Sequence, residues 1–309
     1  MAITAGMVKE LREISGAGMM DCKKALTATD GDMDKAVEFL RENGLAKAEK
    51  KAGRVAAEGM VATNISADGK TAAIVEVNSE TDFVAKNEKF QNYVAQVAAQ
   101  VATTTATDVD AFLEEAWIED ASKTVKENLA SMIAVIGENM TIRRFAKLQA
   151  EDGVIESYIH AGGKIGVLVQ AKTTENNDEV KACLKNVAMQ IAALNPKYTS
   201  RNEVDQDYIE HEKEILKAQA MKEKPDATEK IIDGMVMGRI NKELKEICLL
   251  DQVYVKAEDG KQSVGKYVES VAKATGTALE ITGFVRYETG EGIEKVETDF
   301  AAEVAAQLQ

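Results

Sequence analysis

An internal repeat constrains the fold of this chain more than any other feature of its sequence. The segment that begins at Gly59 matches the segment that begins at Gly153 without gaps, at an offset of 94 residues. In each copy, alternating apolar residues flank a turn and lead into apolar residues spaced three and four apart, which predicts a β-hairpin followed by a helix. The identical positions include Gly59, Gly69, Lys70, Val75, Gln96, Ala98 and Ala99, which fall on Gly153, Gly163, Lys164, Val169, Gln190, Ala192 and Ala193.

One stretch, Thr81 to Asn87, differs between the copies. Phe83 lies there in the first turn of the predicted helix, which Thr81 or Asp82 can cap. Local sequence favours an aromatic staple that packs under its own helix over an anchor for a partner protein. The second copy has Asn177 at the position of Phe83. A staple that the fold required would be apolar in both copies, so the repeat favours partner contact.

The hydropathy pattern predicts an α+β chain of four parts. Residues 1–55 read as an N-terminal three-helix module, and residues 56–145 and 146–285 each contain one copy of the repeat. The second of these includes a projecting antiparallel helical hairpin at about 203–247, because its highly charged helices carry only a narrow apolar seam. Residues 286–309 read as a C-terminal helical module.

Turn, cap and periodicity signals predict boundaries within these parts. Gly44 should end the third helix of the N-terminal module. Helices are expected around residues 109–117 and 122–138, with Trp117 in the core, and a strand near residues 253–256.

The helical hairpin has its own predicted cap and seam. Asp226 and Glu229 fit a capping box for the second arm. The expected seam consists of Val204, Tyr208, His211, Ile215 and Ala218 on one arm and Met237, Ile240, Leu244 and Ile247 on the other.

Two apolar groups allow both a packing role and a binding role. Met19 and Met20 follow two glycines, and local sequence favours the core, although adaptable methionines on a loop also suit a binding face. Phe300 and Val304 mark a stripe at four-residue spacing near the chain end. Without other evidence such a stripe docks on its own core.

Composition excludes several classes of partner. The formal net charge of −14 opposes binding to phosphate backbones, so no direct nucleic acid partner is expected. The three cysteines stand far apart without a CxxC pair, as in reduced cytosolic proteins, and structural zinc is not expected. The chain has neither a signal-peptide layout nor an apolar run of about 20 residues, which predicts a cytoplasmic protein without membrane contact.

Motifs for catalysis and ligand binding fail on inspection. Asp30 begins an apparent calcium loop, but Lys35 occupies its glycine position. Lys164 follows two glycines as in a phosphate loop, but Ile165 replaces the hydroxyl residue that binds the metal. Neither histidine lies beside a nucleophile, and carboxylate pairs arise by chance among 52 acidic residues. No catalytic residue, metal, cofactor or small-molecule substrate is therefore expected.

Several long motifs in order resemble the bacterial translation elongation factor Ts family over nearly the whole chain. These motifs are Val8–Arg12 with Gly16–Leu26, Thr81–Asn87, Ile136–Asn139 ahead of Arg143 and Arg144, Ile165–Val169, and Gly290–Lys295. The resemblance implies a guanine nucleotide exchange factor for the GTPase elongation factor Tu. It also implies that the N-terminal module is similar to ubiquitin-associated domains and that the core consists of two related subdomains.

The resemblance also assigns partner contacts to individual residues. Thr81, Asp82, Phe83 and Val84 match the family residues that disturb the magnesium site of the GTPase, with the phenylalanine inserted near the switch region. Arg12, Met19 and Met20 match contacts to the GTPase domain. The terminal helix with Phe300 and Val304 matches a further contact, and the second subdomain near His160 matches a contact to another partner domain.

Two other functional classes compete with nucleotide exchange. A scaffold or chaperone would use the helical module and hairpin without any effect on nucleotide, so added GDP would leave its complexes unchanged. An acid–base enzyme would require a deep pocket lined by carboxylates and turnover without a partner.

Overall fold

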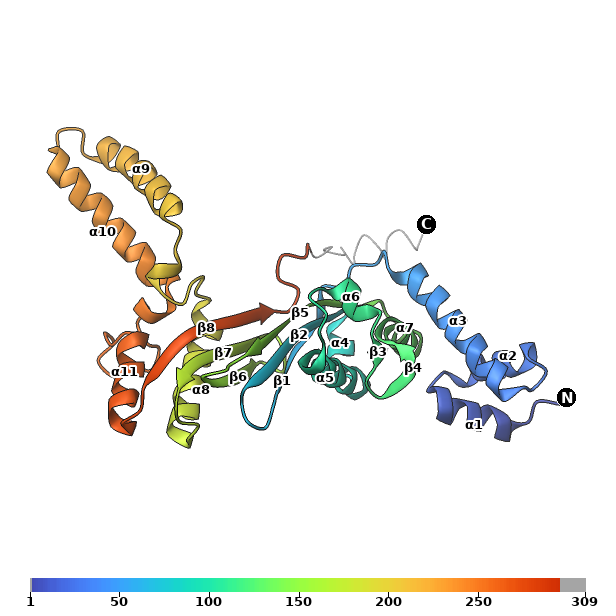
Figure 1. Ribbon diagram of the computed structural model, residues 1–309. Helices are drawn as coiled ribbons and strands as arrows, with labels where there is room; N and C mark the ends of the chain where they lie inside the picture. The colour runs from blue at the N-terminus through green and yellow to red at the C-terminus, as the bar shows by residue number, and fades with distance from the viewer. Residues whose placement is uncertain (1, 295–309) are drawn as a thin grey trace.

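The computed structural model describes residues 2–294 and combines helices with small antiparallel sheets, with the N-terminal helices and a helical hairpin at opposite ends (Figure 1). The N-terminal helices are α1 (Ala5–Ser15), α2 (Met19–Ala28) and α3 (Met33–Lys51). They pack around a small apolar core that includes Leu11 and Leu26, both fully buried.

The predicted end of the third helix at Gly44 was wrong. Gly44 lies buried inside α3, against α7 (Val125–Ile136), where an added Cβ would lie 3.8 Å from the carbonyl oxygen of Ala130. Arg41, on the same helix, forms an ion pair with Glu127 of α7. Packing between the two helices therefore carries α3 through a residue that weakens an isolated helix.

The first copy of the repeat forms a three-stranded antiparallel sheet in the order β1–β2–β5. Its strands are β1 (Glu58–Ile65), β2 (Thr71–Ser79) and β5 (Met140–Gln149). A short helix, α4 (Asp82–Ala85), follows β2 directly, and α5 (Glu88–Thr103) packs its apolar stripe on one face of the sheet.

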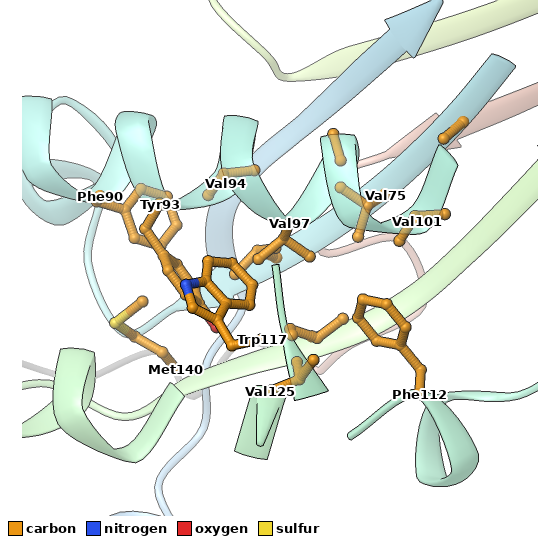
Figure 2. Packing of buried hydrophobic residues seen from close by; sticks show 14 of the residues in the cluster. Val75, Phe90, Tyr93, Val94, Val97, Val101, Phe112, Trp117, Val125 and Met140 are labelled. Carbon is orange, nitrogen blue, oxygen red and sulfur yellow. The ribbon is translucent and has the colours of Figure 1, made fainter. Parts of the chain in front are cut away.

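The predicted helix around 109–117 extends too far at its C-terminal end, and the predicted helix around 122–138 extends too far at its N-terminal end. The helix α6 (Val109–Leu113) stops early, and β3 (Ala116–Trp117) pairs with β4 (Asp120–Thr124) before α7 begins. Trp117 is 4% exposed, which confirms its predicted core position. Figure 2 shows its ring beside Tyr93, with 5.9 Å between the ring centroids.

The second copy has the same sheet order as the first. Its sheet order β6–β7–β8 joins β6 (Gly153–His160), β7 (Ile165–Thr173) and β8 (Leu279–Glu288). The helices α8 (Asp178–Leu194) and α11 (Val264–Thr275) pack over it. The bulge between Glu76 and Val77 of the first sheet recurs between Gln170 and Ala171, the positions that the repeat offset predicts.

The two sheets pack against each other through faces that their helices leave free. Ala73, Val75 and Val77 of β2 face the first helical layer, whereas Ala72 and Ile74 join a separate cluster with residues of the second sheet. Because β2 is covered on both faces, it is buried along almost its whole length.

The contact between the sheets is pseudo-symmetric. The Ile155 N–H donates to the Gly69 carbonyl at 2.8 Å, and the Val61 N–H donates to the Gly163 carbonyl at 2.7 Å. The repeat offset exchanges these two bonds, because it places Val61 on Ile155 and Gly69 on Gly163. Each copy therefore offers the same surface to the other, as the subunits of a twofold homodimer do.

The helical hairpin consists of α9 (Gln206–Glu223) and α10 (Glu229–Ile247), confirming two antiparallel arms (Figure 1). Its seam was partly mispredicted, since Ile215 and Met237 are 38% and 48% exposed. The residues of the two arms that belong to this apolar cluster are Tyr208, Ile209, Leu216, Ala220, Ile232, Met235, Val236, Ile240, Leu244 and Ile247. The capping box was wrong too, since Thr228 is the N-cap and makes no side-chain cap bond.

At the base of the hairpin, residues 253–256 do not form the predicted strand. Only an isolated bridge joins Val253 to Ser263 there, followed by a turn in which the Ala257 N–H donates to the Tyr254 carbonyl. The strand β8 then leads to a loop that reaches back to the first sheet, where the Gly290 N–H donates to Glu76 at 2.8 Å.

Candidate functional site

The turn that carries Phe83 presents one side chain to solvent and buries the next. Phe83 is 80% exposed, while Val84 is 8% exposed and belongs to the core of the first copy. The staple suggested by local sequence is therefore wrong, and the exposed ring is accessible to a partner, so that partner contact stays a prediction. Large aromatic side chains presented in this way are typical of protein-binding sites.

Thr81 fixes the start of this turn. Its hydroxyl accepts the Val84 N–H at 3.4 Å as the N-cap of α4 and donates to Glu138 Oε1 at 2.7 Å. Its backbone N–H donates to Glu138 Oε2 at 3.0 Å. The turn is thus held from the loop between α7 and β5 as well as from within.

Asp82 adds an exposed negative charge next to Phe83. A hydrogen bond and ion pair with Lys86, at 2.7 Å, lower the pKa of this carboxyl below its usual range, and the positive charge of Lys164 adds to the effect. Asp82 is therefore ionised at neutral pH and can meet a cation or a hydrogen-bond donor of a partner.

The second copy uses the equivalent loop for internal contacts. Asn176, which replaces Asp82, donates from Nδ2 to the Asp68 carbonyl at 3.3 Å. Asn177, which replaces Phe83, caps α8 by accepting the Val180 N–H at 2.9 Å. The helix in this copy therefore begins at Asp178, without a separate short helix equivalent to α4.

The N-terminal module presents a second exposed apolar group. Met19 and Met20 are 58% and 77% exposed, so the expectation that they belong to the core was wrong, and Arg12, on the preceding helix, is exposed as well. Ile14, in the last turn of α1, is 57% exposed as well. The helix ends two residues later at Gly16, in the left-handed conformation.

His160 lies exposed at the end of β6, and its Nδ1 is 3.0 Å from the hydroxyl of Tyr158. The turn that follows contacts β1, where Lys164 Nζ lies 2.5 Å from Glu58 Oε2. Because Glu58 pairs with Ser79 at the end of β2, this turn lies near the strand that leads to Thr81. Phe300 and Val304 lie outside the described residues.

Chemical sites of other kinds have little support within residues 2–294. No group of three or more His, Cys, Asp or Glu side chains there could hold a metal ion, and no helix there has the length and hydropathy to cross a bilayer. Cys183 is buried, and burial raises the pKa of its thiol to about 11, which disfavours the thiolate. A groove of about 550 Å³ beside Asp68 and Glu175 lies in the second copy's equivalent of the Phe83 turn.

Comparisons with known proteins agree on one family. The family model described as elongation factor TS matches residues 80–291. The chain is 54% identical to elongation factor Ts of Clostridium tetani (strain Massachusetts / E88) over 308 residues, which cover 99% of this chain and 100% of that protein. It is 55% identical to elongation factor Ts of Clostridium botulinum (strain Eklund 17B / Type B) over 307 residues, which cover 99% of both chains.

Proposed function

This chain belongs to the elongation factor Ts family, and from that premise we propose that it is a guanine nucleotide exchange factor. It binds elongation factor Tu in the GDP-bound state and accelerates GDP release in the cytoplasm. Its partner surface comprises the turn from Thr81 to Val84, the N-terminal residues Arg12, Met19 and Met20, the region of His160, and the terminal residues Phe300 and Val304.

The observation that carries this proposal is an exposed Phe83 on a turn whose start is held by Glu138, present in one copy of the repeat only. Magnesium and backbone amides hold the diphosphate in GTPases of this kind, so a group that displaces them weakens nucleotide binding. Each tenfold acceleration requires about 1.4 kcal/mol of differential stabilisation, and a buried aromatic anchor supplies about 2–4 kcal/mol. No covalent bond is broken, so the factor needs no catalytic side chain and no cofactor.

The parts of the chain take separate roles in this proposal. Residues 1–55 act as a module similar to ubiquitin-associated domains, residues 56–145 and 146–285 act as two related core subdomains, and residues 286–309 complete the contact. The hairpin at about 203–247 forms a short coiled coil that extends the surface. Reciprocal linkage then requires that GDP or GTP weaken the complex by the factor by which the complex weakens nucleotide binding.

Release of fluorescently labelled GDP from elongation factor Tu tests the proposal. The wild-type chain should accelerate release in a saturable manner, and Phe83→Ala should reduce the maximal rate by about thirtyfold to several-hundredfold, which follows from losing an anchor of about 2–4 kcal/mol. A complex that forms but releases GDP at the unassisted rate would instead support a scaffold or chaperone. Unchanged release by Phe83→Ala at saturating factor would remove Phe83 from the mechanism.

A further inference from the structure

Glu138 holds Thr81 with both of its carboxylate oxygens. One oxygen accepts the Thr81 N–H at 3.0 Å and the other accepts the Thr81 hydroxyl at 2.7 Å. Hydrogen bonds to an ionised acceptor are stronger than those between neutral groups. Since the same hydroxyl caps α4, the position of α4, and with it the direction of Phe83, depends on this pair of bonds.

A second set of bonds fixes the loop that carries Glu138. The Asn139 N–H donates to Glu80 Oε1 at 2.5 Å, and Asn139 Nδ2 donates to the Arg54 carbonyl at 2.8 Å. Asn139 itself is only 3% exposed. Glu138 therefore acts from a fixed loop, and its hold on Thr81 transmits that rigidity to the turn.

The second copy closes the same loop without a carboxylate. The repeat places Glu80 on Thr174, and the matching registers of β5 and β8 place Glu138 on Thr277. These two threonines are joined by a single contact of 3.1 Å between their hydroxyl oxygens. The fold of a copy thus closes with a neutral pair, and the carboxylate occurs only in the copy that carries Phe83.

We propose that Glu138 is a positioning residue for nucleotide exchange, which acts through Thr81 to keep Phe83 in the orientation that enters the partner. This inference rests on the proposed exchange function and extends it to a residue that contacts the turn at Thr81. Loss of the clamp should lower the maximal rate of GDP release more than the affinity for the GTPase, because the other contact surfaces remain in place.

The test compares Glu138→Gln with Glu115→Gln in full-length factor. Glu115 also accepts a threonine hydroxyl, at 2.6 Å, but from Thr104, which caps the end of α5 opposite to the Phe83 turn. Glu138→Gln should lower the maximal rate of labelled GDP release from elongation factor Tu by about tenfold, the effect of losing charge-assisted bonds of this kind, and shift the half-saturating concentration by less than about threefold. Glu115→Gln should stay within about twofold of wild type in both.

Two further variants separate positioning from a loss of folding. Glu138→Asp keeps the charge on a shorter side chain and should give an intermediate loss of rate. In a Phe83→Ala background, Glu138→Gln should change the maximal rate by less than about twofold, because the side chain that Glu138 positions is then already absent. An unchanged rate for Glu138→Gln, or an equal loss in the Phe83→Ala background, would overturn the role of Glu138.

Amide hydrogen exchange of the free factor tests the clamp without the GTPase. The amides of residues 81–87 should exchange at least about tenfold faster in Glu138→Gln than in wild type or Glu115→Gln, because the Thr81 N–H loses its acceptor. If amide exchange is unchanged in Glu138→Gln while the wild-type chain accelerates GDP release from elongation factor Tu, only the role of Glu138 is overturned. If the wild-type chain does not accelerate GDP release, the proposed function is overturned, regardless of the exchange rates.

Discussion

Tyr93 sits in the densest part of the first core, beside Trp117 and Phe90, with a hydroxyl that no hydrogen-bonding group among residues 2–294 satisfies (Figure 2). Burial raises the pKa of this phenol, so the group stays neutral. An unsatisfied buried hydroxyl costs free energy without any compensating bond. Tyr93→Phe should therefore raise the free energy of unfolding by about 1 kcal/mol, measured by urea denaturation followed by circular dichroism.

Tyr208 offers a matched control for this prediction. Its hydroxyl donates to Glu243 at 2.5 Å, across the seam of the helical hairpin. Tyr208→Phe should lower the free energy of unfolding, by about 0.5–1.5 kcal/mol, because it removes a bond that is made. A loss of stability in both variants would show that the hydroxyl of Tyr93 has a partner in solution.

At the candidate site, sequence predicted Phe83 better than it predicted the methionines. The repeat supplied an internal comparison for Phe83, because a position that the fold requires to be apolar would not become Asn177. Met19 and Met20 have no second copy, and local sequence beside two glycines favoured the core for them. Both lie in the first turn of α2, where local sequence does not determine which side chains face solvent.

At the scale of elements, buried Glu76 joins β2 to the loop that follows β8. It is fully buried and pairs with Arg143 at 3.0 Å and with Arg144 at 2.5 Å. Burial alone would raise the pKa of Glu76, but hydrogen bonds from the Gly290 N–H and the two arginines outweigh it and hold the pKa below its usual value. The ionised form of Glu76 thus ties elements far apart in the chain.

This linkage predicts an acid-sensitive contribution to stability. A lowered pKa in the folded state stabilises the fold above the usual carboxyl pKa, and the contribution disappears as pH falls through the lowered value. Glu76→Gln should therefore lower the free energy of unfolding at pH 7 by about 2–4 kcal/mol, since it leaves two arginines without their partner. Below about pH 4 the difference from wild type should shrink, as protonation removes the same charge from wild type.

Glu156 provides a control of opposite sign. Burial raises the pKa of this carboxyl, so its ionised form opposes folding and stability increases as pH falls through the raised value. Glu156→Gln should leave stability at pH 7 unchanged or higher. Denaturation curves between pH 3 and pH 7, which spans the ordinary carboxyl range, distinguish the two residues; parallel curves for both variants would contradict the ion network.

Sequence predicted the strands of the repeat better than the segments between its copies. The strands β2 and β7 follow from alternation, from turns at fixed offsets and from comparison of two copies. The hairpin of β3 and β4 was missed because Leu113 and Trp117, four residues apart, continue a helical pattern in the sequence. Trp117 instead packs into the first core from a strand. The seam of α9 and α10 was shifted because apolar residues on charged helices fit more than one register.

At the scale of the whole molecule, the loop between α7 and β5 links two surfaces of the proposed factor. Lys51 of α3 donates to the Gly137 carbonyl at 2.5 Å, next to the residue that holds Thr81. The helix α3 is also joined to α7 by the ion pair of Arg41 and Glu127. The N-terminal module and the Phe83 turn are therefore held to one loop, which sets the distance between the two proposed contacts.

The pseudo-symmetric contact between the sheets gives a prediction with its own internal control. Gly69 and Gly163 occupy equivalent turns, and both have positive φ angles, of 72° and 100°. A Cβ on Gly163 would lie 2.8 Å from Cβ of Met60, whereas the nearest atom to a Cβ on Gly69 is 3.6 Å away. The two backbone hydrogen bonds are thus symmetric, but the packing around Gly163 is tighter than the packing around Gly69.

Gly69→Ala should cost about 1 kcal/mol of unfolding free energy, because only the backbone strain of a positive φ opposes it. Gly163→Ala carries backbone strain of the same kind, at a φ further from the left-handed minimum, and must also displace β1 at Met60, so it should cost about 2–4 kcal/mol. Urea denaturation of the full chain at pH 7 measures both losses. Since the two changes are the same in kind, equal losses would mean that the sheets adjust freely at their contact and that the tighter packing around Gly163 does not limit the substitution.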